Sequence, residues 1–148
     1  MKKVILCTLL ASTSVFLLPS LATTESNEDV EIAEAWASIE GFFEEFNNED
    51  NEAMQKYMTF PHLFLSRNGR VSVEPERWTM NFERMKKDQD WVKSTLNSHS
   101  VTMVFPDKVH FKIAFSRHNS KGENYMTQEG VYIATKKDGK WGLQVRSY

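Results

Sequence analysis

The alternation of apolar and polar residues is clearest in the C-terminal third of the chain. From Val109 to Phe115 every odd-numbered residue is large and apolar, whereas positions 110, 112 and 116 are polar. This period of two predicts a strand with one buried face. Two further strands are predicted at 130–135 and 141–147, because Asp138-Gly139 lies between them and glycine adopts the positive φ that a hairpin turn needs. The apolar face of such an antiparallel meander must pack against another amphipathic element.

A helical period earlier in the chain predicts such an element. Apolar residues recur at spacings of three, four and seven up to Phe46, which predicts an amphipathic helix that ends near Asn47. The polar run 47–51 breaks this helix and offers caps for a second, short one. The apolar positions of the two helices are Ile32, Ala35, Trp36, Ile39, Phe42, Phe43 and Phe46, then Ala53, Met54, Tyr57 and Met58.

A small hairpin and a third helix are predicted in the middle of the chain. Asn68-Gly69 turns a strand over 60–66 into a second strand over 70–73. A helix is expected to start at 74–77, with Pro75 near its first turn and apolar residues at helical spacing after it. A long strand over 101–105 then leads into the meander. These elements predict one α+β domain over about residues 28–148, with helices on one face of a curved mixed or antiparallel sheet.

The first 22 residues have the composition of a secretory signal. Lys2 and Lys3 precede an apolar run that ends in the small-residue exit Ser20-Leu21-Ala22. We expect cleavage after Ala22, a flexible lead-in over 23–27, and a periplasmic or secreted bacterial protein; an uncleaved membrane anchor is the alternative. Cys7 is the only cysteine, so a cleaved chain has no thiol for a disulfide, a metal or a nucleophile.

Charge argues against one class of partner. The net charge is −2, from 18 basic and 20 acidic side chains, and removal of the two leader lysines leaves 16 against 20, or −4. A nucleic-acid-binding protein needs a basic face, which this balance does not favour. We therefore expect no nucleic-acid partner and no stable membrane insertion after cleavage.

The order of elements, together with several local motifs, resembles the nuclear transport factor 2-like superfamily, which includes SnoaL-like and ketosteroid-isomerase-like proteins. The motifs are Phe42 to Tyr57, with its FNNEDNEAM pattern, Phe60-Pro61-His62, Phe115-Ser116-Arg117 and the run DGKWGL at 138–143. The resemblance implies a cone-shaped curved sheet wrapped around three N-terminal helices, with a pocket at the open end. It does not imply one function, because the superfamily includes isomerases, dehydratases, hydrolases and binding proteins.

The candidates for acid–base chemistry are His62, Glu129 and Tyr57. A histidine can exchange a proton near neutral pH, although a hydrogen-bonded structural role is the alternative for His62. Glu129 is the only carboxylate that the pattern puts inside a meander strand, and its direction depends on the hairpin register. A three-residue loop at 137–139 turns Glu129, Val131 and Ile133 inward, whereas a two-residue loop turns Gly130, Tyr132 and Ala134 inward instead.

A binding pocket requires fewer coincidences than a catalytic pair. Arg117 continues the inward parity of 109–115 and could hold a carboxylate or phosphate at the pocket rim, or pair with a helix glutamate. The residues predicted to contact a ligand are Trp36, Phe43, Tyr57, His62, Trp78, Phe115 and Arg117. His110 and His118 lie about 26 Å apart along an extended strand and cannot share a metal ion. We therefore expect neither a metal nor a cofactor.

Three functions follow as hypotheses. The first is binding of a small apolar or aromatic ligand, with an anionic group as one option; the second is an isomerase-like or dehydratase-like acid–base enzyme using His62 with a nearby carboxylate. The third is a structural or protein-interaction domain with a filled cone. A homodimer through the outer face of the sheet, with Ala114, Tyr132 and Ala134 as contacts, is a further hypothesis that rests on the resemblance.

Overall fold

The computed structural model describes residues 26–148, so the predicted signal peptide and the start of the lead-in lie outside the described residues. The described chain has helices α1 (Asn27–Asn47), α2 (Asn51–Met54) and α3 (Phe82–Gln89), a 3-10 turn η1 (Gln55–Tyr57), and strands β1 (Met58–Leu65), β2 (Val71–Glu74), β3 (Trp91–Phe105), β4 (Lys108–Asn119), β5 (Asn124–Lys137) and β6 (Lys140–Ser147). The α+β class predicted from the sequence is confirmed.

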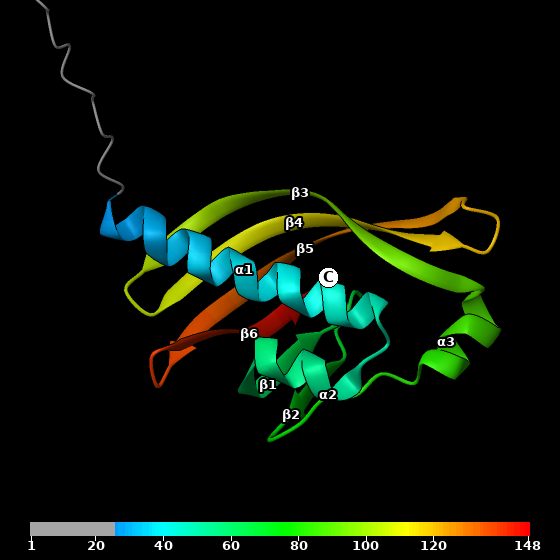
Figure 1. The fold of residues 1–148 in the computed structure, drawn as a ribbon, viewed down its shortest axis with the longest axis horizontal. Helices are drawn as coiled ribbons and strands as arrows, with labels where there is room; N and C mark the ends of the chain where they lie inside the picture. Colours follow the sequence, from blue (N-terminus) through cyan, green and yellow to red (C-terminus); the bar gives the residue numbers. More distant parts are fainter. Residues whose placement is uncertain (1–25) are drawn as a thin grey trace, which may run out of the picture.

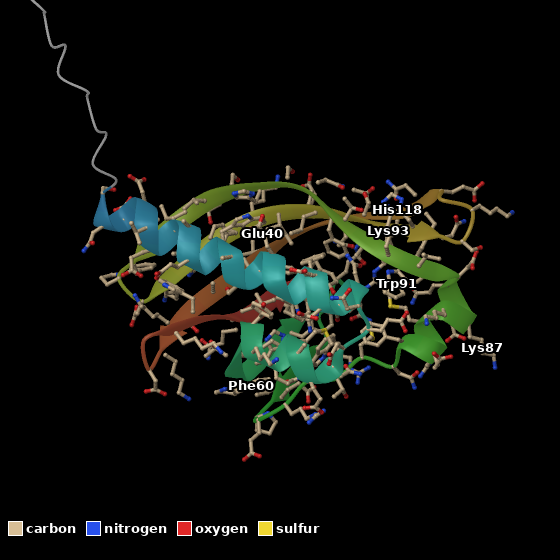
Figure 2. The ribbon with its side chains drawn as sticks, viewed as in Figure 1. Glu40, Phe60, Lys87, Trp91, Lys93 and His118 are labelled. Atoms are coloured by element: carbon tan, nitrogen blue, oxygen red, sulfur yellow. The ribbon has the colours of Figure 1, made fainter. Side chains whose placement is uncertain are left out.

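The six strands form one open, mixed sheet in the order β2-β1-β6-β5-β4-β3. All neighbours are antiparallel except β1 and β6, which are parallel. Helix α1 lies along one face of this curved sheet, and α3 lies at the far end of β3 (Figure 1). The core is where α1 meets the sheet, and Trp91, which opens β3 directly after α3, is buried there (Figure 2).

Helix α1 begins one residue earlier than the predicted domain. The Ser26 hydroxyl accepts from the Asp29 backbone N–H at 3.2 Å, and the Asp29 carboxylate accepts from the Ser26 backbone N–H at 3.2 Å. This reciprocal pair is a capping box, which satisfies donors that the first turn of a helix leaves free. Ser26, which falls within the predicted lead-in, is therefore the N-cap of α1.

The predicted start of the third helix at 74–77 is wrong. Helix α3 begins at Phe82, and the Asn81 side chain caps it by accepting from the Arg84 backbone N–H at 2.8 Å. The segment before it is irregular because side-chain amides of α2 and η1 bind its backbone. The Asn51 amide makes two such bonds to Met80, and the Gln55 amide makes two to Trp78.

The β5–β6 register settles which side chains of β5 face inward. Lys137 pairs with Lys140 across a two-residue turn, Asp138-Gly139, so the three-residue alternative is wrong. Tyr132 and Ala134 are consequently buried on the inner face, at 2% and 0% exposure, and cannot contribute to a dimer contact on the outer face. Of the three expected dimer positions, only Ala114 remains outside.

Glu129 lies on the outer face as a result of the same register. Its carboxylate forms a 3.1 Å ion pair with Lys112 and is mostly solvent-exposed. The inward position that the longer turn would have given it is therefore wrong.

Gly142 permits the close approach of the parallel pair β1 and β6. A Cβ atom at this position would lie 2.7 Å from the backbone carbonyl carbon of Met58. Backbone atoms cannot move aside as a flexible side chain can, so β1 would have to shift.

We expect Gly142→Ala to lower the free energy of unfolding by about 1–3 kcal/mol, the usual range for overpacking. Urea denaturation of the wild type and the variant measures this loss. Lys140→Ala, at an exposed position of the same strand, is the matched control and should leave stability unchanged. An unchanged midpoint for Gly142→Ala would contradict the proposed close approach.

Candidate functional site

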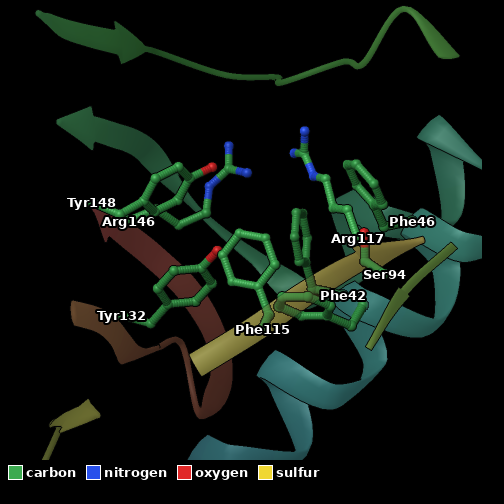
Figure 3. Close-up of a pocket in the computed structure, with 9 residues that line it drawn as sticks. Phe42, Phe46, Ser94, Phe115, Arg117, Tyr132, Arg146 and Tyr148 are labelled. Atoms are coloured by element: carbon green, nitrogen blue, oxygen red, sulfur yellow. The ribbon is translucent and has the colours of Figure 1, made fainter. Parts of the chain in front are cut away.

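A small cavity lies where the inner face of the sheet meets the C-terminal half of α1. Its volume is about 20 Å³, which is room for one water-sized group. Figure 3 shows two guanidinium groups, Arg117 and Arg146, directed toward the same side of the cavity above a set of aromatic rings. The lining residues are Phe42, Phe43, Phe46, Ser94, Phe115, Arg117, Tyr132, Arg146 and Tyr148.

A β-bulge in β6 turns Arg146 inward. Leu143 pairs with Ala134 and Val145 pairs with Ile133, so Gln144 is an extra residue between the two pairs. One extra residue reverses which side chains face the core. Leu143 and Arg146 therefore both point inward, and Arg146 is only 5% exposed.

Aromatic rings surround the Arg146 guanidinium. Its central carbon lies 4.2 Å from the ring centre of Trp78, 5.2 Å from that of Phe42 and 5.5 Å from that of Phe64. These distances are within the range of cation–π attraction. The rings favour the positive charge but offer it no counter-charge.

His62 is the hydrogen-bond partner of Arg146. Arg146 Nε donates to His62 Nε2 at 3.0 Å, and His62 Nδ1 lies 3.3 Å from the Leu143 carbonyl oxygen. This arrangement requires the neutral tautomer with its proton on Nδ1. Burial, with the positive charge of Arg146 as a second cause, lowers the pKa of His62 from 6.5 to about 3. His62 is thus uncharged at neutral pH, with both nitrogens engaged.

Arg117 lies at the rim of the cavity, on β4. One of its terminal nitrogens donates to Gln89 Oε1 at 3.1 Å, whereas its Nε is buried without a hydrogen-bond partner. Arg117 therefore has donor capacity that the protein does not use.

The remaining polar lining groups are hydroxyls. Burial raises the pKa of Tyr132, so its hydroxyl remains protonated. Ser94 and Tyr148 contribute the other two hydroxyls. Within residues 26–148, no aspartate or glutamate side chain forms an ion pair with Arg117 or Arg146. Two cations, hydroxyl donors and no acid give the cavity the chemistry of an anion site.

Side-chain amides fix the walls of the cavity. The two bonds from Gln55 hold the backbone of Trp78, and so place its ring over Arg146. Asn47, the last residue of α1, donates to the Ser94 carbonyl oxygen at 2.9 Å and accepts from the Ser94 N–H at 2.8 Å. Each amide takes the place of a backbone neighbour, for the irregular segment at Trp78 and for the free edge of β3 at Ser94.

The structure brings together five of the seven predicted ligand contacts. Phe43, Phe115 and Arg117 line the cavity, while His62 and Trp78 contact Arg146 behind it. Their aromatic rings pack against one another and do not enclose a large apolar cavity.

The other predicted residues lie elsewhere. Trp36 stacks on His99, with ring centres 3.6 Å apart, and Tyr57 packs beside Gly41. With Glu129 on the outer face, the three acid–base candidates His62, Glu129 and Tyr57 do not converge. In the part of the chain that the structure describes, no cluster of three or more histidine, cysteine or acidic side chains could hold a metal ion.

The sequence pattern did not place Arg146 in the cavity. Strict alternation of inward and outward side chains was assumed along β6, and the bulge at Gln144 breaks that alternation. Counting from Leu143 in steps of two places Val145 inside and Arg146 outside. The available signal was an arginine directly after the mostly apolar run 141–145, with Asp138 as the nearest acidic residue in the sequence.

No protein-family model matches the sequence, and a search of curated protein sequences finds no match either. Among solved structures, the chain is similar to a cystatin-like protein of unknown function from Nostoc punctiforme, with TM-score 0.63, 16% identity, and coverage of 80% of this chain and 89% of that one. It is also similar to an NTF2-like protein of unknown function from Shewanella oneidensis, with TM-score 0.55, 14% identity, and coverage of 79% and 97%.

A third similar structure is a protein from Catenulispora acidiphila in complex with S-DNPA. The TM-score is 0.62 at 9% identity, and the match covers 79% of this chain and 90% of that one. Among the described residues, no helix combines the length and the apolar character needed to cross a membrane.

The similarities to these solved structures show that the chain has the α+β fold of the NTF2-like and cystatin-like proteins.

Proposed function

We propose that this protein binds a small molecule through its acidic group, which Arg146 and Arg117 hold. The observation that carries the proposal is a buried guanidinium without a protein carboxylate. A buried charge is costly unless it is paired, and the partners of Arg146 are a neutral histidine and three aromatic rings. A carboxylate from solution would supply the missing counter-charge through one of its oxygens.

The size of the cavity decides how much of the ligand enters. A volume of about 20 Å³ holds one water-sized group, so one oxygen of the acidic group enters and the remainder stays at the rim beside Arg117, because phenylalanine rings fill the rest of the cone. The apolar body of the ligand would project outward past Tyr148. The Catenulispora acidiphila protein, which has a similar fold, is in complex with S-DNPA.

An acid–base enzyme is less well supported. His62 gives its acceptor nitrogen to Arg146 and has no carboxylate beside it. We infer that His62 is a positioning residue for Arg146 and does not transfer protons.

We further propose that the protein acts outside the cytoplasm, on the evidence of the leader sequence at 1–22. Mass spectrometry of the secreted or periplasmic fraction should give a chain that starts at Thr23. A chain with an intact Met1 in the cytosol would contradict export.

Binding of a carboxylate should depend on Arg146. We expect phenylacetate to bind the wild-type protein in a calorimetric titration, and Arg146→Gln to weaken binding by about 10–100-fold, the value of one charged hydrogen-bonded contact. Phenylacetamide, which has the same body without the charge, should not bind detectably. Arg84→Gln, at an exposed surface pair with Asp88, is the control and should bind normally.

Arg146→Met separates binding from folding. Methionine keeps the apolar contacts with the rings and removes the unpaired charge, so this variant should be no less stable than the wild type. It should no longer bind phenylacetate. Equal affinity of all variants for phenylacetate would reject the proposal.

Acidification should destabilise the protein through His62. Between pH 6.5 and about 3 the unfolded chain binds a proton at His62 that the folded chain does not, so stability falls as the pH falls through this window. Between pH 7 and pH 5 this contribution amounts to about 2 kcal/mol.

His62→Gln tests this effect because glutamine can still accept from Arg146 Nε but does not titrate. Urea denaturation at both pH values should show a loss of stability that is about 2 kcal/mol smaller in the variant than in the wild type. An identical loss in the two proteins would show that His62 is not held neutral by the fold.

A further inference from the structure

A groove lined by both polar and aromatic residues adjoins the cavity on the side of the β1–β2 hairpin. Its volume is about 750 Å³, and Tyr148 lines both the groove and the cavity. The Tyr148 ring lies against Phe115, which lines the cavity, and against Phe64, which lines the groove, with ring centres 5.7 Å and 5.2 Å apart. A ligand anchored at Arg146 therefore leaves the cavity along Tyr148 and Phe64.

Arg67 and Arg70 line the groove beyond Phe64. A terminal nitrogen of Arg67 donates to Gln128 Oε1 at 2.7 Å, which holds the guanidinium at the groove wall. Among the described residues, no aspartate or glutamate lines this groove, and none forms an ion pair with Arg67 or Arg70.

The arginines of this chain divide into two groups. Arg77 and Arg84 each pair with a carboxylate on the surface. The other four, Arg67, Arg70, Arg117 and Arg146, have no acidic side chain as partner within residues 26–148, and all four line the cavity or the groove. Four arginines without acidic partners along one path give both ends of that path donors that can hold an anionic group.

Resting on the proposed function, we propose that the ligand is a dianion with acidic groups at both ends of an apolar chain. One group enters the cavity at Arg146, and the other reaches Arg67 and Arg70. Phe64 pairs with Arg146 across the parallel strands, and Arg67 follows three residues later in the hairpin turn. At no more than about 3.3 Å per residue the two ends lie within roughly 10 Å, which suits a straight-chain dicarboxylate of medium length.

The test compares nonanedioate with nonanoate, which has the same chain and one carboxylate. By calorimetry at low salt, the dicarboxylate should bind about tenfold more tightly, and this advantage should shrink at high salt because surface charges are screened. Propanedioate, which is too short to reach both ends, should gain nothing from its second charge.

The double variant Arg67→Gln/Arg70→Gln assigns the second site. It should reduce the affinity for nonanedioate to that for nonanoate and leave nonanoate unchanged. Equal affinities of the two acids for the wild type, or equal effects of the double variant on both, would overturn this inference alone. Failure of both acids to bind would overturn the proposed anion site as well.

Discussion

The unpaired charge of Arg146 is the constraint on which the rest of the site depends. A guanidinium at 5% exposure needs partners that tolerate its charge, and the chain supplies three aromatic rings and a histidine held neutral by burial. A single inward glutamate would satisfy this charge and close the site to other anions. On our account, the acidic side chains are kept away so that the counter-charge comes from the ligand.

Several irregular features of the fold serve this arrangement. The bulge at Gln144 turns Arg146 inward, the amide of Gln55 holds Trp78 above it, and the amide of Asn47 fixes Ser94 at the opposite wall. The bulge and the Trp78 segment depart from regular secondary structure, whereas Ser94 lies in the edge strand β3. The regular elements, α1 and the long strands, supply the packed aromatic core against which these side chains are held.

The elements with strong periodicity could be predicted from the sequence, and the site only in part. The amphipathic period gave α1, and the parity of β4 correctly placed Phe115 and Arg117 on the inner face. Strand parity alone misplaces Arg146, because the extra residue in β6 is Gln144, a residue type that does not by itself mark a bulge. The irregular segment 75–81 was missed for a related reason. Trp78, Phe82 and Met85 have helical spacing, but hydrogen bonds from the distant Asn51 and Gln55 override it.

The most direct test of this account is a crystal structure of the protein with para-bromobenzoate, whose bromine can be located by anomalous scattering. We predict that the carboxylate lies between Arg146 and Arg117, and that the bromine lies beside Tyr148 on the path to the groove. The His62 contact to Arg146 should be retained. A crystal in which the acid lies elsewhere, while Arg146 keeps only its aromatic and histidine contacts, would contradict the claim that this charge takes its partner from solution.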